Sequence, residues 1–137
     1  NFFHNVKVYY EDTDAGGIVY YANYLKYLER ARTEALLTIG LSNLKIKDKF
    51  SAQIIVKSCN IEYKKPAHLE DELKIRSFIK SVTKTSFYMN QIITNAESTI
   101  VEAQVHLVFV NEKNKPVKVP EIIFDNFKPY FCDSIKL

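Results

Sequence analysis

The sequence predicts an α+β fold, an antiparallel sheet of about five strands on one long helix, in a single domain over residues 1–137. Apolar residues recur every three to four positions in one long segment only. After that segment they alternate with period two through about four shorter segments, which is typical of strands. The 137 residues, 47% hydrophobic and 26% charged, suffice for one domain with a real core and exclude a disordered or fibrous chain.

The first predicted strand runs from Phe2 to Tyr10. Its apolar and aromatic side chains are those of Phe3, Val6, Val8 and Tyr10. A loop follows over residues 11–17, with the sequence Glu-Asp-Thr-Asp-Ala-Gly-Gly. Only three glycines occur in the chain, and two of them, Gly16 and Gly17, are adjacent here. Because glycine tolerates backbone conformations that other residues avoid, we expect a sharp turn directly after the carboxylates.

The long helix is predicted from Asn23 to about Ile39. Its apolar positions are Leu25, Leu28, Ala31 or Arg32, Ala35 and Ile39. Asn23 suits the N-cap, and Gly40 stands where a left-handed residue commonly ends a helix. No other long helix is expected. A short helix is predicted over Pro120–Phe127, with Pro120 in its first turn.

Between these helices, period-two alternation predicts four strands. The first, from Ile55 to Tyr63, places Ile55, Cys59, Ile61 and Tyr63 on one face. The next three faces are Leu73, Ile75, Ser77 and Ile79; Phe87, Met89, Gln91 and Ile93; and Val101, Ala103, Val105, Leu107 and Phe109. Turns are expected over residues 82–85, 95–98 and 111–116. Neighbouring hairpin strands run antiparallel.

One helix covers only one face of such a sheet. Several positions on the opposite side of the alternation are nevertheless not polar, namely Tyr88, Ile92, Val108 and Val110. We therefore expect a partner subunit to cover part of the second face.

The charge pattern argues against a nucleic-acid-binding protein. Nineteen basic and sixteen acidic residues give a net charge of +3, spread along the chain. The densest basic stretches are Lys45, Lys47 and Lys49, and the pair Lys64-Lys65. A solvated face is the simplest interpretation of both, and a binding site for the phosphates of a nucleotide-bearing cofactor is the alternative.

Cys59 and Cys132 are too far apart in the sequence for a CxxC redox pair or a zinc cluster. A domain of this size does not need the one disulfide they could form, which favours a reducing cytosol. No stretch approaches the roughly 20 apolar residues that span a bilayer, and the amino end lacks a leader pattern. We expect a cytoplasmic protein.

The glycine pair lies between carboxylates and the start of the long helix. Free amides at a helix N-terminus are oriented donors suited to a carbonyl oxygen that gains negative charge. A carboxylate a few residues upstream could reach the carbonyl carbon or its attacking water, so the segment carries two ingredients of acyl transfer. The simpler alternative is that Asp12 and Asp14 only cap a turn. Calcium is disfavoured, because the segment becomes apolar at residues 18–20 where an EF-hand loop needs further ligands.

The run Tyr-Tyr-Glu-Asp-Thr-Asp-Ala-Gly-Gly-Ile-Val-Tyr over residues 9–20, followed by Asn-Tyr-Leu and Glu-Arg-Ala-Arg, resembles a known family. It is similar to the hotdog-fold acyl-CoA thioesterases of the 4-hydroxybenzoyl-CoA thioesterase family, and within it to the bacterial thioesterases associated with the Tol-Pal gene cluster. The motif covers about the first quarter of the chain. The order of one helix and then four strands agrees with a hotdog fold over nearly all the rest, and residues 63–67 are similar to that family's loop between sheet strands.

The resemblance implies hydrolysis of an acyl-CoA without a metal or redox cofactor. It implies that Asp14 is the catalytic carboxylate, as nucleophile or as general base, and that the backbone amide of Tyr21 is the oxyanion donor. Gly16 and Gly17 would shape the turn, and Asp12 would support it. Many relatives carry histidine where this chain has Tyr21. Because the implied oxyanion contact uses the main chain, that change is compatible with activity.

The resemblance further implies a homo-oligomer, a dimer or tetramer of hotdog subunits, and leaves open an association with lipid-synthesis or envelope machinery. The CoA phosphates would lie on basic residues, with Lys64 and Lys65 as candidates. Two alternatives remain. A hotdog hydratase or dehydratase would need a catalytic histidine near a carboxylate, but His4, His68 and His106 are isolated in the sequence. A noncatalytic acyl-CoA-binding or protein-interaction module is the other. The Gly-x-Ser-x-Gly motif of α/β-hydrolases does not occur.

Overall fold

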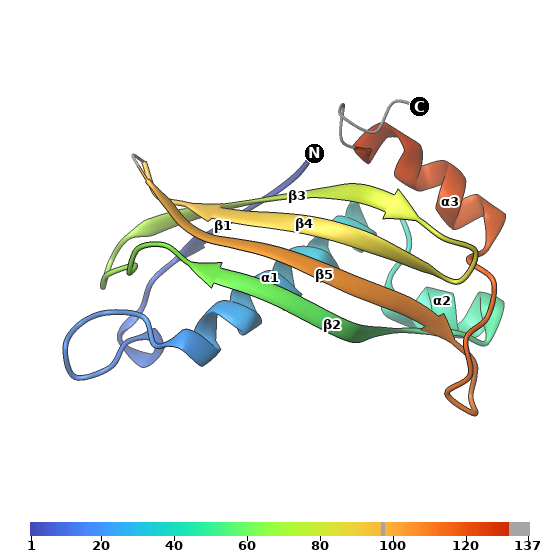
Figure 1. The fold of residues 1–137 in the computed structure, drawn as a ribbon, viewed down its shortest axis with the longest axis horizontal. Helices are drawn as coiled ribbons and strands as arrows, with labels where there is room; N and C mark the ends of the chain where they lie inside the picture. Colours follow the sequence, from blue (N-terminus) through green and yellow to red (C-terminus); the bar gives the residue numbers. More distant parts are fainter. Residues whose placement is uncertain (97, 132–137) are drawn as a thin grey trace.

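Five strands form one antiparallel sheet in the order β1-β3-β4-β5-β2, and the 18-residue helix α1 lies against one of its faces (Figure 1). This is a computed structural model that describes residues 1–96 and 98–131. Its elements are β1 (Phe2–Lys7), η1 (Tyr10–Asp12), α1 (Tyr21–Thr38), α2 (Asn43–Phe50), β2 (Gln53–Tyr63), β3 (Glu72–Val82), β4 (Ser86–Thr94), β5 (Thr99–Val110), α3 (Glu121–Phe127) and η2 (Lys128–Tyr130). The predicted α+β class is confirmed.

The core lies between the helices and the inner face of the sheet. In one half, Tyr24, Leu28 and Ala31 of α1 pack against the sheet. In the other half, α2 and α3 close the core with Ile46 and Phe127. All residues predicted to face inward on β3, β4 and β5 are buried, so the predicted assignment of residues to the inner face is confirmed for these three strands.

Two polar residues on those faces connect the sheet to α1. The Gln91 amide nitrogen donates to the Leu28 carbonyl and to Ser77 Oγ, both at 3.0 Å. Arg32 Nη1 donates to Gln91 Oε1 at 3.1 Å. Arg32 therefore points toward the sheet, and burial lowers the pKa of its guanidinium, while Cys59 and Glu29 act in the opposite direction.

The first strand is shorter than predicted. The strand ends at Lys7, and its buried side chain is Phe2, whereas Phe3 is 59% exposed. Val8 is buried just beyond the strand, and Tyr10 belongs to η1 rather than to the strand. Since two phenylalanines are consecutive in the sequence, either one could have faced the core.

The predicted face of β2 is partly wrong. Cys59 and Ile61 pack against the core, but Ile54 does so in place of Ile55. The register against β5 shifts between Val56 and Ser58, so one extra residue reverses the alternation. The strand also forms no hairpin with β3: it pairs with β5 at the far edge of the sheet.

The helices differ from the prediction at two places. Helix α1 begins at Tyr21 with Tyr20 as its N-cap, so Asn23 is a buried residue inside the helix, and Leu25 is exposed. Its end is confirmed, since Gly40 follows the C-cap with φ +78°. Helix α2 was not predicted: it carries Lys45, Lys47 and Lys49, and the hydroxyl of Ser42 caps it by accepting from the Lys45 amide at 3.1 Å.

The outer face is less open than the sequence suggests. Val108 and Val110 are already buried within the single chain, and the chain itself returns beside Val110, where Pro116 forms a bridge with it. Tyr88 and Ile92 are half-buried. Across the described residues, no helix combines the length and apolar character needed to cross a membrane. Cys132 lies outside the described residues.

Candidate active site

The segment with the two adjacent glycines forms a tight hairpin turn. The Asp14 amide donates to the Ile18 carbonyl at 2.9 Å, and the Gly17 amide returns to the Asp14 carbonyl at 3.0 Å. Thr13 and Val19 form an antiparallel bridge at its base. Gly17 adopts φ +79°, which L side chains rarely adopt. The sharp turn expected from the sequence is confirmed.

Asp14 sits at the first corner of this turn with an exposed side chain. Its Oδ1 accepts a hydrogen bond from the Gly16 amide at 2.8 Å. A Cβ at position 16 would stand 3.3 Å from that same oxygen, which explains a glycine there without a positive φ. Within the described structure no hydrogen bond reaches Oδ2. The turn therefore fixes one carboxylate oxygen and leaves the other available.

The first turn of α1 follows directly. Tyr21 is the first helical residue, and no side chain caps the helix. The Tyr21 amide has no hydrogen-bond acceptor among residues 1–96 and 98–131. Such an amide points along the helix axis with partial positive charge. The Tyr21 ring is 69% exposed and lies 4.6 Å from the ring of Tyr63 at the end of β2, centroid to centroid. In Figure 1, the loop before α1 and the start of that helix lie at one end of the molecule.

Residues 67–69 hold the turn from the other side, and sequence reasoning assigned them no such part. Val19 donates to the Ala67 carbonyl at 2.9 Å, and Leu69 donates to the Gly17 carbonyl at 3.0 Å. His68 forms a bridge with Ile18. These contacts join segments about fifty positions apart. They use backbone groups, which every residue type has, so the sequence could not predict them.

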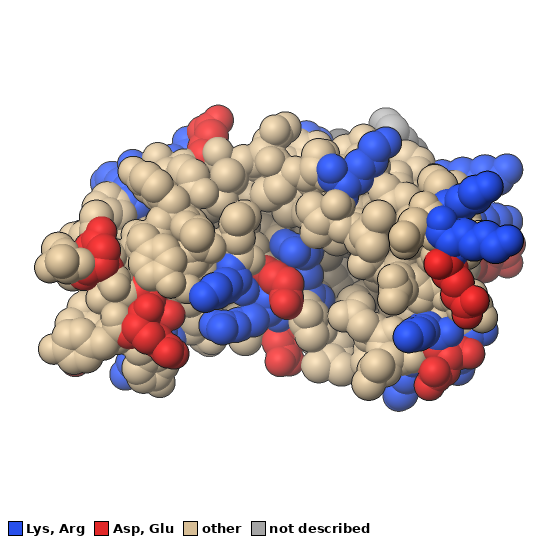
Figure 2. Space-filling model, turned by 90° about the horizontal axis from the view of Figure 1, so that it is seen from below, with Lys and Arg blue, Asp and Glu red and all other residues tan. Residues whose placement is uncertain are grey.

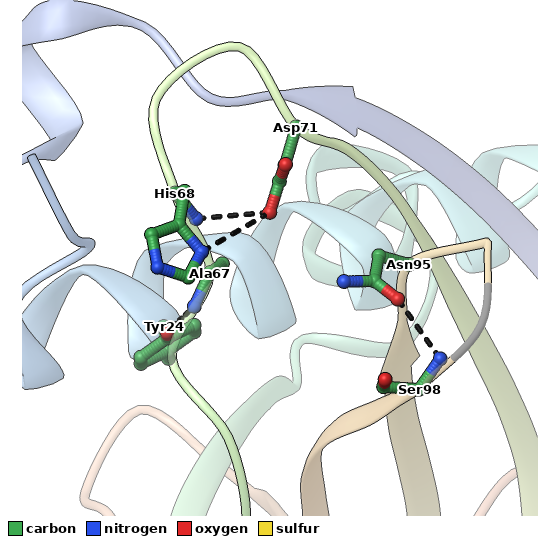
Figure 3. A network of polar contacts seen from close by, with 6 residues as sticks. All are labelled: Tyr24, Ala67, His68, Asp71, Asn95 and Ser98. Atoms are coloured by element: carbon green, nitrogen blue, oxygen red, sulfur yellow. Dashed lines mark hydrogen bonds and ion pairs between the residues drawn. The ribbon is translucent and has the colours of Figure 1, made fainter.

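Figure 3 shows how that loop is fixed in turn. The Ala67 amide donates to the hydroxyl of Tyr24 on α1 at 3.0 Å, and burial raises the pKa of this tyrosine. The His68 amide donates to Asp71 Oδ2 at 2.9 Å, and His68 Nδ1 lies 3.8 Å from the same oxygen. His68 is thus engaged with Asp71. The hairpin after β4 closes separately, where the Ser98 amide donates to Asn95 Oδ1.

Asp12 is the buried acid of the loop, with 8% of its surface exposed. Its Oδ2 accepts from the Tyr9 amide at 3.0 Å and so closes the single turn η1. A carboxylate that is buried and occupied in this way suits the supporting part predicted for Asp12 rather than contact with a substrate.

The two candidate phosphate-binding lysines differ. Lys64 Nζ lies 3.5 Å from Glu62 and 3.6 Å from Glu102, so its charge is already paired. Lys65 is exposed, and no ion pair is found for it in the described part of the chain. On the face drawn in Figure 2, acidic side chains lie beside most of the basic ones. The basic side chains gather most densely at the right end of this view, with acidic ones beside them.

The remaining polar sites lie elsewhere. His106 is on β5, where its Nε2 lies 2.9 Å from Ser86 Oγ and its ring stacks on Tyr88 at 4.0 Å. Burial, and then Lys57, lower its pKa. A cavity of about 680 Å³ at the β1–β3 edge includes Lys7 and Glu72 but not Asp14.

No cluster of three or more metal-ligating side chains occurs in the residues that the structure describes.

Comparison with known proteins places these features in context. The sequence profile of the thioesterase-like superfamily matches residues 8–127. The acyl-CoA thioester hydrolase YbgC of Escherichia coli O6:H1 is 44% identical over 125 residues, which cover 90% of this chain and 92% of that protein. The acyl-CoA thioesterase YbgC of Haemophilus influenzae is 36% identical over 117 residues, 85% of this chain and 86% of that protein.

Solved structures agree with the fold. A probable thioesterase from Bartonella henselae matches with a TM-score of 0.82 and 32% identity, over 86% of this chain and 98% of that one. Slr0204 from Synechocystis, a 1,4-dihydroxy-2-naphthoyl-CoA thioesterase, matches with a TM-score of 0.85 and 25% identity, over 93% and 95%. The predicted hotdog architecture is confirmed by these neighbours.

Proposed function

The chain belongs to the thioesterase-like superfamily and is a thioester hydrolase, and from this premise we propose that it cleaves acyl-CoA esters with Asp14 as the reacting carboxylate. The observation that carries the proposal is the geometry of the turn. It presents an exposed carboxylate, with one oxygen tied to the Gly16 amide, just before a helix whose first amide is unpaired. The YbgC proteins to which the chain is similar are named for acyl-CoA substrates.

Two routes are compatible with one carboxylate. As a general base, Asp14 takes a proton from water, whose oxygen attacks the thioester carbonyl carbon. Collapse of the tetrahedral intermediate breaks the C–S bond, and the protonated Asp14 returns its proton to the leaving thiolate, so that the acid and the CoA thiol are released. As a nucleophile, Asp14 attacks the same carbon and expels the thiolate, leaving a mixed anhydride that water then hydrolyses. Both routes place negative charge on the carbonyl oxygen.

The Tyr21 amide is the proposed donor to that oxygen. It is a main-chain group at a helix N-terminus, so its direction is fixed before the substrate binds. One such donor contributes about 3 kcal/mol of transition-state stabilisation in a hydrolase. A tyrosine side chain at position 21 leaves this main-chain contact intact.

For the CoA phosphates, Lys65 is the better of the two candidate residues. Lys64 would have to leave both Glu62 and Glu102 before it could bind a phosphate. Activity without a metal or redox cofactor, a cytoplasmic location and the Tol-Pal association stay predictions.

We also propose that two copies pair through β2, in a dimer or in a tetramer built from such dimers. This strand is one of the two edge strands in the order β1-β3-β4-β5-β2, and β5 is its partner among the described strands. Its exposed apolar side chains include Ile55, Val56 and Tyr63. A long edge strand of this kind readily pairs with a second chain.

The test of the function is release of free thiol from a panel of aliphatic and aromatic acyl-CoAs by the purified protein. We expect turnover of at least one class, with the free acid and CoA in equal amounts. Tight acyl-CoA binding without thiol release would instead support the noncatalytic module. Hydration of an enoyl-CoA without thiol release would support the hydratase.

A further inference from the structure

Three polar side chains are buried together beneath the turn. Asp12 on η1 is 8% exposed, and Asn23 and Tyr27, one helical turn apart on α1, are 2% and 1% exposed. Tyr27 has a raised pKa because of its burial and then because of the Asp12 carboxylate, whereas Asn23 lowers that pKa. Both neighbours therefore face the Tyr27 hydroxyl.

Two donors in this cluster have no partner. Neither the Asn23 side-chain nitrogen Nδ2 nor the Tyr27 hydroxyl makes a hydrogen bond within the described structure. Buried polar groups without a partner are rare and lower the stability of a fold. Where they persist they are commonly found at functional sites, where stability is given up for activity.

The cluster joins the two parts of the proposed active site. Asp12 accepts from the Tyr9 amide, and the chain reaches Asp14 two residues later. Asn23 lies two residues after Tyr21 in the first turn of α1. A contact between Asp12 and these donors would fix the base of the hairpin turn against the helix that presents the Tyr21 amide.

We propose that Asp12, Asn23 and Tyr27 are positioning residues for thioester hydrolysis, and that in the substrate complex Tyr27 donates to the Asp12 carboxylate while Asn23 donates to the Tyr27 hydroxyl oxygen. Catalytic hydrogen bonds are often long in a free enzyme and tighten only when the substrate binds. A displacement of about 1 Å at a reacting group costs on the order of a hundredfold in rate. This inference rests on the proposed function of Asp14 and Tyr21.

The test compares Tyr27→Phe and Asn23→Leu with the wild type. Each variant removes a donor that is unpaired in the free protein; Phe keeps the ring of Tyr27, whereas Leu is bulkier than Asn23. We expect Tm to stay equal or rise in Tyr27→Phe, and in both variants we expect kcat on an acyl-CoA to fall at least tenfold and KM to change less than twofold. The matched control is Asn90→Leu on β4, whose buried side-chain oxygen is also unpartnered but which lies outside the motif. Its kcat should stay within twofold of the wild type.

Coupling to Asp12 is tested by a double-mutant cycle. Asp12→Asn keeps an oxygen for the Tyr9 amide and removes the charge. In that background, Tyr27→Phe should reduce kcat by less than a further twofold, because the contact is already lost. Additive losses would overturn the proposal, as would an unchanged kcat in Tyr27→Phe or in Asn23→Leu. If one of the two variants does not fold, the other decides.

The outcomes separate this inference from the function on which it rests. A wild type without thioesterase activity, or a fully active Asp14→Asn, overturns the proposed function. A wild type that is active, an Asp14→Asn that is not, and a Tyr27→Phe with unchanged kcat overturn only the positioning role.

Discussion

Gly17 and Gly40 share a backbone conformation but lie at different places in the fold. Their φ values are +79° and +78°, and an added Cβ would meet nothing within 4 Å at either position. Gly40 follows the end of α1, whereas Gly17 closes the turn after Asp14. A substitution by alanine should therefore strain the backbone equally at the two positions, but only Gly17 lies beside the proposed site.

We predict that Gly17→Ala and Gly40→Ala each lower the free energy of unfolding by about 1 kcal/mol, because a left-handed conformation strains an L residue. Urea unfolding measures this. Only Gly17→Ala should also reduce kcat/KM, since it alone disturbs the turn that holds Asp14. Equal losses of activity in the two variants would show that the effect is general destabilisation.

Gly16 is constrained by space rather than by its backbone angle. In Gly16→Ala the new methyl group would lie 3.3 Å from Asp14 Oδ1, so the carboxylate must shift by a few tenths of an ångström. We predict a severalfold fall in kcat with little change in Tm, because a small displacement of a reacting group is costly for rate. A variant with wild-type kcat would show that the position of Asp14 is not critical.

The sequence predicts individual site residues where all of them fall within one short segment and their chemistry follows from residue type. Asp14, Gly16, Gly17 and Tyr21 fall in a single motif, and the structure brings them to one end of α1. The local pattern favours Asn23 as a helix cap, but it lies inside α1 and is buried by packing against other parts of the chain. That packing is tertiary, and no local pattern encodes it.

Among the elements, the strands with one clean alternation were predicted correctly and the irregular ones were not. β3, β4 and β5 keep apolar and polar positions apart along most of their length, so their faces could be assigned. The register of β2 shifts between Val56 and Ser58, so alternation alone assigns part of its face wrongly, and β1 ends at Lys7 instead of Tyr10. Strand order could not be predicted either, because β2 pairs with β5 across the 35 residues that separate them.

Helix α2 was missed because eight residues give too short a pattern, although its caps are readable in retrospect. Ser42 accepts from the Lys45 amide, and Ser51 ends the helix in a left-handed conformation with φ 50°. We predict that Ser42→Ala lowers the free energy of unfolding by about 1 kcal/mol. Ser51→Gly should raise it by up to about 1 kcal/mol, because glycine adopts that conformation without strain. Both are measured by urea unfolding, and a neutral Ser42→Ala would contradict the capping role.

The proposed dimer concerns the whole molecule, since it joins two chains along the edge strand β2. If two chains pair through β2, analytical ultracentrifugation of the wild type should give at least twice the mass of one chain. Charged side chains on an edge strand disfavour pairing with a second strand, so Val56→Lys should shift the protein toward the single chain. Leu44→Lys, on the exposed side of α2, is the control and should leave the mass unchanged. A wild type that sediments as one chain would contradict the pairing.

The proposed hydrolysis depends on one carboxylate, and kcat/KM of Asp14→Asn for an acyl-CoA tests its role most directly. Glu11→Gln, which changes an exposed carboxylate of the same loop, is the matched control. We predict a loss of at least a hundredfold for Asp14→Asn, with an unchanged Tm and with wild-type activity in Glu11→Gln. A folded Asp14→Asn protein that keeps full activity would contradict the assignment of Asp14 as the reacting group.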